Sequence, residues 1–75
     1  MDIQQLIIGK EYKITHAYGQ PPQKVKVLIV EEEESEMWGK YWIAHVIFTS
    51  DDCTKGMRMS MNEIECERYL HPLEN

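Results

Sequence analysis

The fold of this chain is decided by one stretch, Lys40-Tyr41-Trp42-Ile43-Ala44-His45-Val46-Ile47-Phe48-Thr49. Successive side chains of a β-strand point to opposite faces. As a strand, the stretch has a first face of apolar side chains, Trp42, Ala44, Val46 and Phe48. Its second face is also mainly apolar and carries Tyr41, Ile43, His45 and Ile47. Apolar groups on both faces predict a central, strongly bent strand, which the closure of a small barrel requires.

Two further strands are predicted on the N-terminal side of this stretch. Residues 11–18 alternate with a period of two, and one side would carry Tyr12, Ile14, His16 and Tyr18. Residues 24–33 form the next strand, with Val25, Val27 and Ile29 on one side and Lys24, Lys26, Leu28 and Val30 on the other. Pro21 and Pro22 separate the two strands, because proline has no N–H to donate to a sheet.

The first residues predict a short element that precedes the sheet. Asp2 is a suitable N-cap for a turn in which Ile3, Leu6 and Ile7 share one face, and Gly9 would end it. The alternative is an irregular arm that packs Leu6 and Ile8 against the core.

The C-terminal third predicts a strand, one helical turn and a last strand. Residues 57–61 alternate, and Met57, Met59 and Met61 would fill the core from one face. The segment Ser60-Met61-Asn62-Glu63 matches a capping box, which predicts a single helical turn over residues 61–66. Residues 67–71 would form the closing strand, which Pro72 ends. A longer helix, with an antiparallel sheet in an α+β fold, is the alternative.

This order of elements resembles the SH3-like small β-barrel, in the broad sense that includes Tudor-like and KOW-like domains. The resemblance is carried by three segments, residues 6–12, 46–48 and 57–64, and it spans residues 6–71. It points to no specific family. It implies an all-β barrel of about five strands with one short helical turn near the C-terminus, a scaffold that usually binds peptides, proteins or nucleic acids. Fold alone does not fix function.

Length and charge limit the classes of function. The chain has 75 residues and a net charge of −5, so we expect one domain over residues 1–75. Residues 1–30 carry four lysines against two acidic residues, a net of +2, and the remainder carries four basic and eleven acidic residues, a net of −7. The acidity is therefore local. A broad phosphate-binding surface is disfavoured, because the overall charge would repel a polyanion.

The acidic run of the predicted hairpin and the aromatic residues after it form the candidate partner-binding site. Its members are Glu31, Glu32, Glu33, Glu34, Glu36, Trp38 and Tyr41. Carboxylates would steer the encounter with a basic protein surface, and aromatic side chains would anchor it. Trp38 is expected to be exposed, and Trp42 to belong to the core. The simpler interpretation is a solvated hairpin tip that keeps a small protein soluble.

These observations predict a non-catalytic protein-binding module, a small regulator or inhibitor that acts on a basic partner surface, as a phage-like accessory protein would. One alternative is a nucleic-acid-binding barrel that uses Lys13, Lys24 and Lys26, which fall on the first two strands. Another is a structural homo-oligomer, in which copies of the chain cover the aromatic and methionine side chains.

Catalytic, metal and membrane functions find no support in the sequence. No phosphate loop, nucleophile elbow or zinc-protease motif is present. The histidines His16, His45 and His71 lack ligand spacing, so no metal or cofactor is expected. Cys53 and Cys66 are expected to be free thiols. The N-terminus does not resemble a signal peptide, and no apolar run is long enough for a membrane span, so a cytoplasmic location is expected.

Overall fold

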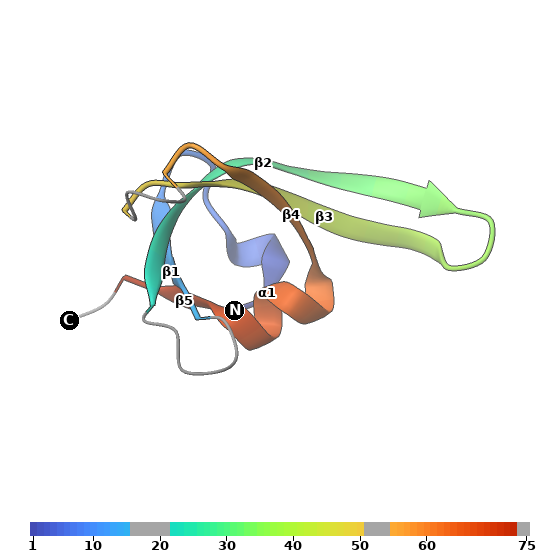
Figure 1. Cartoon of the computed structure of the whole chain (residues 1–75). Helices are drawn as coiled ribbons and strands as arrows, with labels where there is room; N and C mark the ends of the chain where they lie inside the picture. Colours follow the sequence, from blue (N-terminus) through green and yellow to red (C-terminus); the bar gives the residue numbers. More distant parts are fainter. Residues whose placement is uncertain (16–21, 51–54, 74–75) are drawn as a thin grey trace.

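The structure is a computed structural model that describes residues 1–15, 22–50 and 55–73. It contains a 3-10 helix η1 (Ile3–Gln5), strands β1 (Glu11–Ile14), β2 (Gln23–Ser35), β3 (Gly39–Phe48) and β4 (Arg58–Asn62), helix α1 (Glu63–Tyr69) and strand β5 (Leu70–Pro72). The strands form a five-stranded antiparallel sheet in the order β4-β3-β2-β1-β5 (Figure 1). Residues 16–18 of the predicted first strand and the segment that holds Cys53 lie outside the described residues.

The sheet is curved but open, and the expected closed barrel is wrong. Within the part of the chain that the structure describes, β4 and β5 stand at opposite ends of the strand order and do not pair. Helix α1 connects these two edge strands directly, and it contacts both of them as well as η1. The helix fills the position in which the edges would otherwise meet (Figure 1). The five strands and the short C-terminal helix are confirmed.

The core lies on the concave face of the sheet, beneath η1 and α1. Its buried members are Ile3, Tyr12, Ile14, Val25, Val27, Ala44, Val46, Phe48, Met61, Cys66 and Leu70. The alternation predicted for β1 and β3 is thus confirmed at every core position that the structure describes, and Trp42 packs against this cluster while partly exposed. The Tyr12 hydroxyl accepts a hydrogen bond from the Ile7 N–H at 2.9 Å, which satisfies its polar atom inside the core.

A β-bulge in β2 overturns the predicted position of Ile29. The pairing of β2 with β3 shifts register between Val27 and Ile29, so one extra residue of β2 faces β3 there. Val27 is opposite Val46, but Val30 rather than Ile29 is opposite Ala44. Val30 therefore packs against the core and Ile29 is 44% exposed. Strict alternation fails because the inserted residue reverses which face the following side chains occupy.

The helix begins two residues later than the sequence predicts. Asn62, not Ser60, is the N-cap: its side chain accepts from the Glu65 N–H at 2.9 Å, and Glu65 Oε1 accepts from the Asn62 N–H at 3.1 Å. Met61 remains in β4, where it is buried opposite Ala44. Burial of this side chain extends the strand through Asn62, and the helix and last strand are displaced toward the C-terminus.

The N-terminal segment is ordered by a cap and by the end of α1. The Asp2 carboxylate accepts from the Gln4 N–H at 2.9 Å, which confirms the predicted cap, although the turn is a 3-10 helix. The Met1 nitrogen donates to the carbonyl oxygens of Cys66 and Leu70 at 2.8 and 3.0 Å. These contacts join the first residue to the C-terminal end of α1. Among the helices described, none has the length and apolar character needed to cross a membrane.

Candidate functional site

The β2–β3 hairpin extends beyond the rest of the sheet as a two-stranded ribbon (Figure 1). On one side, β1 pairs with β2 only as far as Glu11↔Lys26; on the other, β4 pairs with β3 only from Ile43 onward. The turn is closed by Gly39, whose φ of +74° suits glycine. The Ser35 hydroxyl accepts from the backbone N–H of Met37 at 3.2 Å. This turn leaves Trp38 78% exposed, as predicted.

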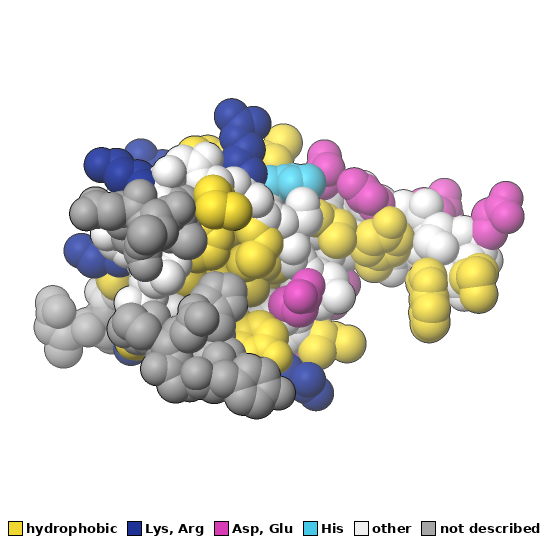
Figure 2. Space-filling view, viewed as in Figure 1, with side chains coloured by type: hydrophobic (Ala, Val, Ile, Leu, Met, Phe, Trp, Pro, Cys, Tyr) yellow, Lys and Arg dark blue, Asp and Glu magenta, His cyan; other side chains and the backbone are white. Residues whose placement is uncertain are grey.

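The alternation of β2 divides the acidic run between the two faces of the hairpin. Glu31 and Glu33 are opposite Ile43 and Tyr41 on the convex face. Glu32 and Glu34 are opposite Trp42 and Lys40 on the concave face, and Glu36 is in the exposed turn. The register therefore places acidic side chains on both faces of the ribbon, and the space-filling view shows acidic side chains along one of its edges (Figure 2). The predicted site residues share the hairpin but not a single face.

The convex face of the hairpin carries a polar network that the sequence analysis did not predict. His45 Nε2 is 3.0 Å from Glu31 Oε1, and His45 Nδ1 is 3.0 Å from Ser60 Oγ. The Tyr41 hydroxyl donates to Glu33 Oε1 at 3.0 Å. The hydrogen bond to His45 is the main reason that the pKa of Glu31 is lowered from its ordinary value, and the bond to Glu33 raises the pKa of Tyr41.

Three side chains of this network have potential metal-ligand atoms close together. One such atom from each of Glu31, Glu33 and His45 lies within 4.8 Å of the others. Both ring nitrogens of His45 already have hydrogen-bond partners, and exposed carboxylates often cluster without a metal. The arrangement is explained by a hydrogen-bonded network, and the expectation of no metal stays a prediction.

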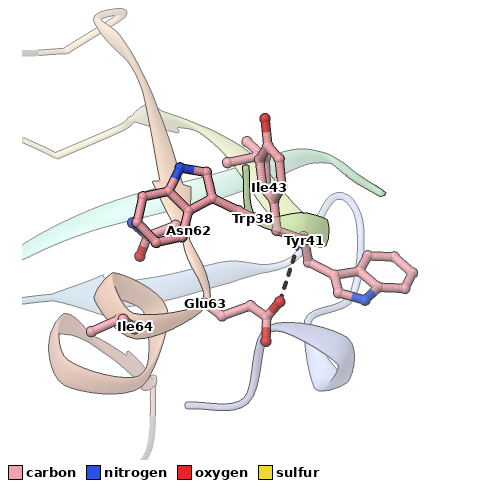
Figure 3. A pocket seen from close by; sticks show the side chains of 7 residues that line it. Trp38, Tyr41, Ile43, Asn62, Glu63 and Ile64 are labelled. Atoms are coloured by element: carbon pink, nitrogen blue, oxygen red, sulfur yellow. Dashed lines mark hydrogen bonds between the residues drawn. The ribbon is translucent and has the colours of Figure 1, made fainter. Parts of the chain in front are cut away.

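A groove lies where the hairpin leaves the body of the protein, between β3 and the start of α1. It encloses about 640 Å³ and is lined by Trp38, Tyr41, Trp42, Ile43, Asn62, Glu63 and Ile64. The Glu63 carboxylate points at the strand and accepts the Trp42 N–H at 3.2 Å (Figure 3). Most of the lining is aromatic or aliphatic, and Trp38 and Ile64 are largely exposed. The groove thus joins two predicted contact residues, Trp38 and Tyr41, to three from β4 and α1.

A basic surface occupies the convex face at the other end of the sheet. Lys13 is directly opposite Lys24 in the β1–β2 pair, and Lys26 is opposite Glu11. The structure therefore brings together the three lysines predicted for the nucleic-acid alternative. Basic side chains gather on the body of the protein and acidic ones on the hairpin (Figure 2). The charge asymmetry predicted along the sequence is also an asymmetry in space.

The remaining histidines and cysteines do not form a site in the part of the chain that the structure describes. His71 is on β5, where its Nε2 is 3.1 Å from Thr15 Oγ1, while His45 is on β3. Cys66 is a buried free thiol, and burial raises its pKa to about 11. His16 and Cys53 lie outside the described residues.

Comparison with known proteins identifies no relative of this chain. No protein-family model, curated protein or solved structure matches it significantly.

Proposed function

We propose that this protein is a non-catalytic binding module that engages a basic surface of a partner protein through the tip of its hairpin and the groove beside it. The observation that carries the proposal is the position of Trp38, 78% exposed on the wall of an apolar groove. A large aromatic side chain held exposed beside a concavity is typical of an interface anchor. Small regulators and inhibitors act in this way, and the groove needs no catalytic group to do so.

The charge of the hairpin supports a basic partner. Glu32, Glu34 and Glu36 are exposed, and within the described residues their carboxylates form no hydrogen bond with another side chain. Their carboxylates would raise the rate of association with a basic surface and lose most of that effect at high salt. The aromatic and aliphatic wall would supply the apolar contact area that charge alone does not.

Affinity capture with matched variants tests the proposal. The protein, immobilised, is exposed to extract from its source organism, and bound proteins are quantified by mass spectrometry. We expect a basic protein that the parent chain retains and that both Trp38→Ala and the triple variant Glu32→Gln/Glu34→Gln/Glu36→Gln lose. Glu67→Gln, an exposed substitution on α1, is the matched control and should retain it. Equal retention by all variants would exclude the hairpin as the site.

The lysine surface supports nucleic-acid binding as a second candidate function. Lys13 opposite Lys24 is a like-charge cross-strand pair, which costs stability unless an anion lies nearby. Binding to labelled single-stranded DNA and RNA, measured against salt concentration, separates the two candidates. Micromolar or tighter binding at about 0.15 M salt, lost in Lys13→Gln/Lys24→Gln, would favour nucleic acid. Light scattering tests the third alternative, a homo-oligomer.

A further inference from the structure

One edge of β3 is uncovered along the groove. The even-numbered residues of β3 direct their backbone groups toward β4, since Phe48 donates to the Met57 carbonyl and accepts from the Gly56 N–H, both at 2.9 Å. Residues an even number of positions apart along a strand share this direction. Lys40 and Trp42 therefore present their N–H and C=O groups on the same side as Phe48.

Strand β4 does not continue far enough to pair with these groups. The last pair between the strands is Ile43↔Asn62, after which the chain turns into α1. β2 pairs with Lys40 and Trp42 on one side of β3, but in the part of the chain that the structure describes no strand pairs with them on the opposite side, which faces β4. A short length of strand edge with unpaired backbone groups is a template for another strand.

A side chain occupies one of the edge positions. The Glu63 carboxylate accepts the Trp42 N–H at 3.2 Å, in the place where a carbonyl oxygen of a neighbouring strand would lie (Figure 3). A carboxylate in this position satisfies the amide in the free protein. It can also be displaced, since Glu63 is an exposed residue of the first turn of α1.

The groove follows this edge and includes side chains from both faces of β3. Tyr41 and Ile43 belong to the convex face, whereas Trp42 belongs to the concave face. A strand added to the edge would place its alternate side chains over these two sets. Trp38 and Ile64 would enclose its ends.

We propose that an extended, basic segment of the partner pairs with β3 at Lys40 and Trp42 and displaces the Glu63 carboxylate from the Trp42 N–H. This inference rests on the proposed function and specifies how the groove is filled. Backbone pairing would supply affinity, and side chains of the segment would supply specificity, as in other cases of strand addition. Basic residues of the segment would face the carboxylates of Glu32, Glu34 and the displaced Glu63. A second copy of this chain would instead bring two acidic hairpins together, which like-charge repulsion disfavours.

Two backbone-methylated peptides test the pairing. The probe is a short fluorescent peptide of alternating lysine and valine, which is extended and basic. Methylation of the valine amides removes one set of N–H donors, and methylation of the lysine amides removes the other. Only one set faces the protein in an added strand, so we expect one methylated peptide to bind at least about tenfold more weakly than the other. The two peptides are matched controls for each other, because composition and charge are the same.

Amide hydrogen exchange gives an independent readout at known positions. With the unmethylated peptide bound, we expect slower exchange of the Lys40 amide and no change at Tyr41, whose N–H faces β2. Binding of both methylated peptides with equal affinity, and unchanged exchange at Lys40, would overturn the pairing and leave the proposed function standing. Equal binding of the peptide by the parent chain and by Trp38→Ala would contradict the proposed function as well. So would the absence of binding by either protein.

Discussion

The imidazole Nε2 of His45 lies 3.0 Å from Oε1 of Glu31, across the β2–β3 pair and two residues out of direct register. Both side chains are partly exposed, at 33% and 42%. The pair stands at the point where the hairpin leaves the five-stranded part of the sheet. It connects the acidic run to β4, because Ser60 contacts the other ring nitrogen. The junction of hairpin and body is thus held by titratable groups.

The pKa of Glu31 should depend on His45. The hydrogen bond from His45 is the largest cause of the lowered pKa, so His45→Ala should raise it toward the ordinary 4.5. A lowered pKa in the folded state contributes stability above the pKa of the unfolded chain, and that contribution is lost as pH falls through the folded pKa. Carbon-detected NMR titration measures the value, with Lys40→Gln as a control that leaves the pair intact. The same Glu31 pKa in parent and His45→Ala proteins would contradict this assignment.

The thiol of Cys66 should react slowly in the folded protein. Only the thiolate is nucleophilic, and a pKa of about 11 leaves little thiolate at neutral pH. In a Cys53→Ser background, alkylation by iodoacetamide at pH 8 should be much slower for native protein than for protein unfolded in guanidinium. Mass spectrometry follows the adduct. Equal rates in the two states would show that the burial of Cys66 is not maintained in solution.

Loss of the N-cap should destabilise α1 more at Asn62 than at Ser60. Asn62→Ala removes the acceptor for the Glu65 N–H and should lower the free energy of unfolding by about 1 kcal/mol. Ser60→Ala removes an exposed hydroxyl that contacts His45 and should cost less. Urea denaturation followed by circular dichroism measures both. A larger loss for Ser60→Ala would place the cap where the sequence alone predicted it.

The hydroxyl of Tyr12 should contribute to stability through the N-terminal segment. Tyr12→Phe keeps the buried ring but leaves the Ile7 N–H without its acceptor at 2.9 Å, which should cost about 1 kcal/mol. The conservative change preserves the packing, so the m-value of the urea transition should stay constant. Tyr69→Phe, at a partly exposed tyrosine, is the matched control. No loss of stability in Tyr12→Phe would mean that water replaces the phenolic oxygen.

The sequence by itself determined the positions of β1 to β4, because alternating apolar side chains have one stable arrangement on a half-buried sheet. It placed the last strand over residues 67–71, of which residues 67–69 belong to α1. It predicted the faces of Tyr12, Ile14, Val25, Val27 and the apolar face of β3. It also located the acidic hairpin and predicted that Trp38 is exposed. Burying five carboxylates in a small core would cost too much free energy, so the hairpin tip has to face solvent.

Only the tertiary structure decided four features of the fold around the candidate site. The bulge after Val27 lets Val30 pack against the core in place of Ile29, which strict alternation would have buried. The helix cap is shifted to Asn62 because Met61 is buried as a residue of β4. The sheet stays open because α1 lies between its edge strands. The groove between β3 and α1 exists because β4 stops at Asn62. No local pattern encodes the distance between elements that are adjacent only after the chain has folded.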